Sequence, residues 1–251
     1  MQRSDHYGSL EWFEREYGKV SEDPWGLTWR PSQWLRYRRA LDALEMAEEP
    51  LSKIIDVGCA TGDFTHLLSK QVGRESLLGV DFVDSAVERA RQRFPSLNFA
   101  TESIFDLGEK YPAQFDAVAC LEVFYYIDRL QRPAALQSLS GVLRRGGYAV
   151  FSSLIGPPPH FSNQEFLDLV GSEFQIIGFE TLYLRWISLL EKAGNKFERL
   201  IQRFGRLEGN GQGRPHIGRL PLPAVAAIEK WSRTLKRLTA SHTIILAQAR
   251  T

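Results

Sequence analysis

Cysteine, histidine and long apolar runs are scarce in this chain of 251 residues. The two cysteines, Cys59 and Cys120, lie in apolar or glycine-rich contexts typical of strand ends, so we expect buried, reduced thiols and no disulfide framework. Five scattered histidines do not form the ligand cluster that a metal site needs, so no bound metal is expected. There is no run of eighteen apolar residues and no signal-peptide pattern at the start. Together these absences predict a cytoplasmic protein without a transmembrane segment.

The charge of the chain is unevenly distributed. The net charge is +1, but residues 181–251 hold 13 Lys and Arg against 4 Glu, whereas residues 1–180 hold 18 basic and 26 acidic residues. A basic surface within residues 185–237 would suit RNA or another anionic partner. A solvated helical surface is the preferred interpretation, because aromatic residues are not interleaved with the basic ones as base stacking requires.

The stretch from Lys53 to Phe64, KIIDVGCATGDF, is the most informative part of the sequence. A short β-branched run is followed by two glycines, Gly58 and Gly62, and then by helical spacing, which predicts a strand, a tight turn and the start of a helix. Glycine lets a ligand approach the main chain closely, and the helix start offers unpaired N–H groups. Taken alone, the pattern could also be an ordinary turn between a strand and a helix.

Strands and helices alternate along the rest of the chain. This alternation predicts a doubly wound α/β sheet whose ligands lie at the carboxyl ends of the strands. A turn is expected at Arg145–Gly147, and Asp84, Ser85 or both are expected to cap the helix that follows the second strand. The predicted strands are 54–57, 77–82, 97–103, 115–123, 148–153, 174–182 and 243–249, and the predicted helices include 9–17, 31–48, 85–94, 132–143 and 162–174.

Four regions are expected. Residues 1–50 form an N-terminal helical lid, 51–184 the core, 185–240 a helical cap inserted before the last strand, and 241–251 that strand. The lid is rich in Trp and Tyr, which suits either simple packing or the cover of a ligand pocket.

Several of these features together resemble the class I S-adenosylmethionine (SAM) methyltransferases. Asp56 with Gly58 to Gly62 resembles the first motif of that family, and Asp81-Phe82 resembles its ribose-binding acid and adenine-stacking neighbour. Leu143 to Gly147 resembles the turn before the fifth strand, with Arg145 in place of proline. The resemblance implies a seven-stranded Rossmann-like fold that binds SAM and releases S-adenosylhomocysteine (SAH). The cofactor-binding residues it implies are Trp25, Arg36, Asp56, Gly58, Cys59, Ala60, Thr61, Gly62, Phe64, Asp81, Phe82, Ser103, Ile104 and Leu121.

A narrower resemblance links the chain to the nodulation N-methyltransferases, which methylate a free amine on a chitooligosaccharide. It is carried by Asp23-Pro24-Trp25, by Arg36 to Leu41, and by Glu122 to Ile127. It implies that Trp25 and Arg36 contact the cofactor from the lid, with Arg36 pairing with the methionine carboxylate. A solvated helix charge is the alternative for Arg36.

Methyl transfer from a sulfonium is an in-line displacement that needs a base only if the acceptor arrives protonated. Glu122, Tyr125, Tyr126 and His160 are the candidates for acceptor binding or proton removal. The leading hypothesis is a methyltransferase that acts on N or O of a small molecule or saccharide. An RNA-modifying methyltransferase and a SAM-binding partner protein without catalysis are the alternatives.

Overall fold

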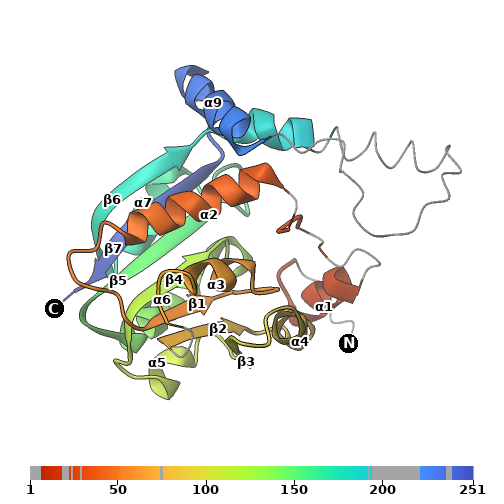
Figure 1. The fold of residues 1–251 in the computed structure, drawn as a ribbon. Helices are drawn as coiled ribbons and strands as arrows, with labels where there is room; N and C mark the ends of the chain where they lie inside the picture. The colour runs from red at the N-terminus through yellow and green to blue at the C-terminus, as the bar shows by residue number, and fades with distance from the viewer. Residues whose placement is uncertain are drawn as a thin grey trace, which may run out of the picture.

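The computed structural model describes residues 7–18, 23, 25–28, 30–73, 76–191, 193, 221–235 and 239–250. They build one seven-stranded sheet with the order β3-β2-β1-β4-β5-β7-β6. The first five strands are parallel, and β7 runs antiparallel to both β5 and β6. The predicted doubly wound sheet is therefore confirmed (Figure 1). The strands are β1 (Ile54–Val57), β2 (Leu77–Asp81), β3 (Asn98–Thr101), β4 (Phe115–Leu121), β5 (Leu143–Leu154), β6 (Phe174–Leu182) and β7 (His242–Ala249).

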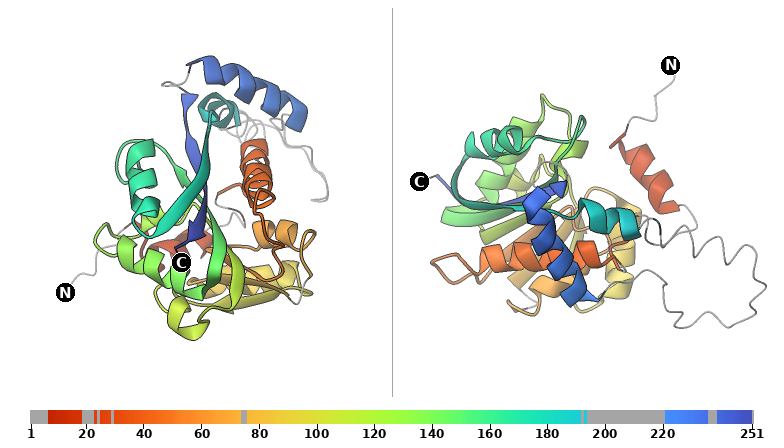
Figure 2. Two further views of the ribbon diagram at one scale, coloured as in Figure 1. Left: turned by 90° about the vertical axis from the view of Figure 1, so that its left-hand side faces the viewer. Right: turned by 90° about the horizontal axis from the view of Figure 1, so that it is seen from above.

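Helices cover both faces of the sheet, as Figure 2 shows. Alternate strand residues point to opposite faces, so each face has its own apolar core. One core joins α5 (Leu107–Lys110), α6 (Arg132–Val142) and α7 (Asn163–Gly171) to Phe151 and its neighbours. On the opposite face, α2 (Pro31–Leu44) and α3 (Asp63–Leu68) pack on residues such as Val150.

Two predicted local features are wrong. The strand expected at 148–153 starts at Leu143, so Arg145–Gly147 lies inside β5, where Gly146 has a φ of 74° and the pairing with β4 shifts register. Helix α4 (Asp84–Arg93) has Val83 at its N-cap position and no side-chain cap. Asp84 instead accepts a hydrogen bond from Thr101 of β3, and Ser85 donates one to Glu14.

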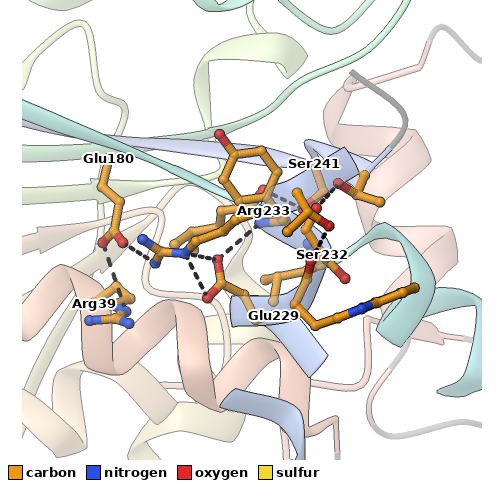
Figure 3. A network of polar contacts seen from close by, with 12 residues as sticks. Arg39, Glu180, Glu229, Ser232, Arg233 and Ser241 are labelled. Atoms are coloured by element: carbon orange, nitrogen blue, oxygen red, sulfur yellow. Dashed lines mark hydrogen bonds and ion pairs between the residues drawn. The ribbon is translucent and has the colours of Figure 1, made fainter. Parts of the chain in front are cut away.

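The described part of the segment before β7 packs on the face that carries α2. It comprises a helix over 185–191, α9 (Leu222–Ser232) and the short turn η3 (Arg233–Leu235). Arg233 donates to Glu180 on β6 at 2.6 Å and to the buried Glu229 on α9 at 3.1 Å (Figure 3). Arg39 of α2 lies 3.8 Å from the same Glu180, so charged contacts join α9, β6 and α2. The division into lid, core, cap and last strand stays a prediction.

Helix α1 (Leu10–Gly18) packs against the start of α4. Phe13 and Tyr17 are buried there with Val83 and Ala86. Both cysteines are buried and free. Within the described residues, no helix is long and apolar enough to cross a membrane.

We predict that Leu136→Ala lowers the free energy of unfolding by about 2–5 kcal/mol, because this α6 side chain is fully buried in the core. Urea denaturation measures the change. Leu130→Ala is the matched control, since Leu130 is 89% exposed, and it should change the free energy by no more than about 0.5 kcal/mol. Equal losses in the two variants would contradict the observed packing of α6.

Candidate cofactor and acceptor site

A cavity of about 760 Å³ lies at the carboxyl ends of β1, β2 and β4. Residues of α1, α2 and the 185–191 helix also line it, as does the start of β7. Sixteen of the eighteen predicted site residues line this cavity. They are Trp25, Arg36, Asp56, Gly58, Cys59, Ala60, Phe64, Asp81, Phe82, Ser103, Ile104, Leu121, Glu122, Tyr125, Tyr126 and His160.

The glycine turn after β1 is fixed by its own hydrogen bonds. Gly58 has a φ of 74°, and a Cβ atom on it would lie 2.4 Å from the Val123 side chain. The N–H groups of Gly58 and Cys59 both donate to the carbonyl of Val80, and that of Ala60 donates to Asp81. These three N–H groups are therefore already paired, and this part of the turn meets a ligand through its shape. The unpaired N–H groups expected at the start of α3 (Asp63–Leu68) stay a prediction.

Thr61 and Gly62 lie outside the cavity lining and shape the turn from behind. The Thr61 hydroxyl donates to Asp63 at 2.8 Å, and Arg93 of α4 binds both carboxylate oxygens of Asp63 at 2.7 Å. A Cβ atom on Gly62, whose φ is 82°, would lie 2.8 Å from the ring of Phe99. Their role as cofactor contacts stays a prediction.

Asp81, the last residue of β2, connects the turn after β1 to the backbone that follows β2. One carboxylate oxygen accepts from the Ala60 N–H at 2.9 Å and the other from the Val83 N–H at 3.1 Å. Burial raises the pKa of Asp81 to about 6, so the group is largely ionised at neutral pH. Each oxygen keeps a second acceptor position, which fits the two neighbouring hydroxyls of a ribose.

Asp56 is more deeply placed in β1 beside α3. Its carboxylate accepts from the Thr65 hydroxyl at 2.6 Å. Burial raises its pKa to about 7, and the nearby charge of Asp81 adds to the effect. This acid is therefore partly protonated at neutral pH, which suits a structural position at the floor of the cavity.

Arg36 and Gln33 bring unpaired donors to the cavity from α2. Arg36 is 8% exposed, so it is not a solvated surface charge, and its Nη1 lies 3.5 Å from Glu122 Oε1. Arg36 Nε and Gln33 Nε2 are buried, and neither has a hydrogen-bond partner among the residues that the structure describes. Such donors need an acceptor in the folded, loaded site, and a ligand carboxylate fits both of them.

Glu122 follows β4 with a φ of 62°, an unusual backbone conformation for a residue with a side chain. The Ser152 hydroxyl donates to its Oε1 at 2.8 Å. Burial alone would raise the pKa of Glu122, but Arg36, His242 and the hydrogen bond from Ser152 outweigh burial and hold it below its usual value. The cavity therefore contains an ionised carboxylate beside a guanidinium.

His242 at the start of β7 also lines the cavity, although from the sequence it had only a weaker claim as a base than His160. Its Nε2 lies 3.9 Å from Glu122 Oε2, and its Nδ1 lies 2.9 Å from Ser241 Oγ. Burial lowers its pKa to about 4, so the ring is neutral at pH 7. The antiparallel direction of β7 could have indicated this position, since the start of such a strand meets the carboxyl ends of its parallel neighbours.

The remaining polar candidates lie together on one wall. Tyr125 and His160 contact each other edge to face, with ring centres 5.0 Å apart. Burial raises the pKa values of Tyr125 and Tyr126, so both hydroxyls stay protonated and neither is a base at neutral pH. Burial lowers the pKa of His160, which leaves a neutral imidazole able to accept a proton.

Aromatic rings close the cavity near α1. Phe13 and Phe82 meet edge to face at 5.3 Å, and the Phe13 ring lies 4.9 Å from that of Tyr126. Trp25 stands 5.9 Å from Phe13. This cluster supports the prediction that the N-terminal segment covers a ligand pocket, although Trp29 lies outside the described residues.

Two further predictions concern a metal site and a basic surface. No group of three or more His, Cys, Asp or Glu that could hold a metal occurs in the described part of the chain. The basic surface proposed for residues 185–237 depends mainly on residues 194–220 and 236–238, which lie outside the described residues. His216, one of the five histidines in the sequence, also lies outside them. Among the described residues of this segment, Arg233 is paired with Glu180 and Glu229.

Residues 54–147, which run from β1 into β5, match a family described as a methyltransferase domain. With this match, the fold and the cavity of the chain resemble those of the class I SAM-dependent methyltransferases.

Within that class the chain resembles nodulation protein S. It is 31% identical to that protein of Rhizobium tropici over 136 residues, which covers 53% of this chain and 56% of the relative. Identity to the Sinorhizobium fredii protein is 29% over 178 residues, covering 68% of this chain and 81% of the relative. The crystal structure of the N-methyltransferase NodS from Bradyrhizobium japonicum WM9 with SAH shares the fold, with a TM-score of 0.64 and 18% identity, over 98% of this chain and 100% of that one.

We predict that Asp56→Asn changes how stability depends on pH. The pKa of Asp56 is about 7 in the folded chain and about 4 in an unfolded one, so folding favours the protonated acid. The wild type therefore loses stability relative to Asp56→Asn as the pH rises from about 4 to about 7, by a few kcal/mol. Urea denaturation of both proteins across this range measures the difference. Parallel profiles would contradict the raised pKa.

Proposed function

We propose that this chain transfers the methyl group of SAM to an amine nitrogen of a small molecule or saccharide. The observation that carries the proposal is the buried Arg36–Glu122 pair, which lines the same cavity as Asp81, Tyr125, Tyr126 and His160. The guanidinium of Arg36 suits the carboxylate of a methionine moiety, and the carboxylate of Glu122 suits its ammonium. Tyr125, Tyr126 and His160 are then left for the methyl acceptor.

In this proposal, different residues of the chain bind different parts of the cofactor. Asp81 accepts hydrogen bonds from the ribose hydroxyls, and Phe82, with Ile104 and Leu121 nearby in the lining, packs on the adenine. Arg36 and Gln33 donate to the methionine carboxylate, and Glu122 accepts from its ammonium. When bound, SAM supplies a methyl group on a positively charged sulfur, which is already an activated leaving group.

The acceptor end has to orient a nucleophile and remove a proton. His160 is neutral and close to Tyr125, so it accepts the proton that an ammonium loses before or during methylation. The hydroxyls of Tyr125 and Tyr126 hold the acceptor by hydrogen bonds. The aromatic cluster of α1 and Trp25 excludes water, which keeps the nucleophile and the methyl carbon in line.

One finding favours nitrogen as the acceptor atom. The structure with SAH that shares the fold is that of an N-methyltransferase. An RNA acceptor has no comparable support from the described residues.

We predict that SAH binds the wild type and that Asp81→Ala weakens this binding by about 30-fold or more. The variant removes hydrogen bonds between a carboxylate and two hydroxyls, each worth about 1.5–3 kcal/mol. Isothermal titration calorimetry measures the dissociation constants. Asp84→Ala is the control, because Asp84 is an exposed acid three residues away and outside the cavity lining. No binding heat for the wild type would refute the cofactor assignment.

The acceptor class is tested with labelled SAM and three probes. We expect methyl transfer to a chitosan oligosaccharide with free amines, and none to its fully N-acetylated form or to a short RNA. His160→Gln should lower the rate on the amine at neutral pH by about 100-fold, while SAH affinity stays within about twofold. Transfer to RNA would support the RNA alternative. Equal labelling of the amine and its N-acetyl form would contradict nitrogen as the acceptor.

A further inference from the structure

Helix α2 is capped by a residue 159 positions away in the sequence. Its N-cap residue is Arg30, Pro31 follows, and no side chain from the helix's own start caps it. Glu191 performs this function from the 185–191 helix. One of its oxygens accepts from the Ser32 N–H at 2.7 Å, and the other accepts from the Ser32 hydroxyl at 2.6 Å and from Arg30 Nε at 3.0 Å.

These contacts are buried and charged. Glu191 is only 1% exposed and Ser32 is 5% exposed. A carboxylate at a helix N-terminus is favoured by the helix dipole and satisfies a backbone N–H that would otherwise lack a partner. Removing one member of a buried charged cluster leaves the others unsatisfied, so the position of α2 depends on Glu191.

The same short stretch of α2 carries the unpaired donors of the cavity. Gln33 follows Ser32 directly, and Arg36 lies about one helical turn further along. The helix that carries Glu191 also lines the cavity, through Arg185, Ser188 and Leu189. Glu191 therefore ties together two walls of the site, one from the N-terminal segment and one from the segment before β7.

We infer that Glu191 is a positioning residue for cofactor binding, which acts by holding Arg36 and Gln33 at the carboxylate end of SAM. The inference rests on the proposed function, in which these two residues bind that carboxylate. Glu191 lies outside residues 54–147, so the segment before β7 becomes part of the cofactor site rather than a separate cap. A carboxylate-binding pair displaced by even 1 Å loses much of its affinity.

The test compares SAH with 5′-methylthioadenosine, which shares the adenosine and the sulfur but lacks the amino-acid group. Calorimetry gives both dissociation constants for the wild type, Arg36→Gln and Glu191→Gln. We expect Glu191→Gln to weaken SAH about tenfold, to leave methylthioadenosine within about twofold, and thus to imitate Arg36→Gln. A purely structural role would lower the melting temperature without this selectivity.

Glu229→Gln is the matched control. Glu229 is also 1% exposed and anchors α9 through Arg233, but within the described residues it does not line the cavity, and its hydrogen bonds come from Arg233 and the Tyr183 N–H rather than from α2. It should lower the melting temperature and leave both dissociation constants unchanged. If it also weakened SAH selectively, general packing of the segment rather than Glu191 would set the site, and the inference would be wrong.

The outcomes separate the two proposals. If Arg36→Gln does not distinguish SAH from methylthioadenosine, the assignment of Arg36 to the carboxylate fails and the inference fails with it. If Arg36→Gln distinguishes them and Glu191→Gln does not, the inference alone is overturned. Should Glu191→Gln not fold, Ser32→Ala removes only the hydrogen bond from the Ser32 hydroxyl to Glu191, and it should still weaken SAH selectively, by about threefold. An unselective Ser32→Ala would then overturn the inference.

Discussion

The two hydrogen bonds that Asp81 accepts, from Ala60 and Val83, are the contacts on which the site depends. They fix the turn after β1 to the end of β2, where parallel strands present their carboxyl ends side by side. Because both bonds come from backbone N–H groups, they hold the carboxylate in place and leave each oxygen a free acceptor position. The glycine turn and the acid therefore form one unit, in which neither is placed without the other.

The cavity also holds two buried side chains of opposite charge, Arg36 and Glu122. Burial of Glu122 costs solvation energy, which the attraction of Arg36 and His242 and the hydrogen bond from Ser152 outweigh. Arg36 Nε and Gln33 Nε2, by contrast, are buried without a hydrogen-bond partner among the described residues. The left-handed backbone at Glu122 adds local strain. Such a combination is expensive for folding alone, and it is typical of a site whose remaining bonding capacity is used by a ligand.

Much of the fold follows from local patterns in the sequence. β-Branched runs, glycine turns and helical spacing were enough to locate all seven strands. The apolar runs are reliable signals because a buried parallel strand such as β4 needs a continuous one. The ends of elements were less predictable because they depend on tertiary contacts. Asp84 and Ser85 carry good capping side chains, yet Thr101 and Glu14 compete for them. Arg145–Gly147 looks like a turn, and the pairing of Leu143 with Phe115 keeps it inside β5.

Motif spacing located Asp81 and Glu122 because Asp81 ends β2 and Glu122 directly follows β4. It did not indicate His242 or Gln33, which reach the cavity from a strand and a helix that are distant in sequence and carry no motif of their own. The contact of Glu191 with α2 could not be predicted from the sequence either, since its partners Ser32 and Arg30 lie 159 and 161 residues away.

The segment before β7 shows what this long-range dependence means for function. Its two described helices are anchored by two buried carboxylates, Glu191 on the N-terminus of α2 and Glu229 on Arg233. Only the first of these contacts reaches the stretch that carries Arg36. In the proposed function, a sequence change in this segment alters the methionine end of the cavity without touching the glycine turn, Asp81 or any residue within 54–147. Cofactor recognition in that proposal is divided between a motif that the sequence displays and a contact that only the folded structure creates.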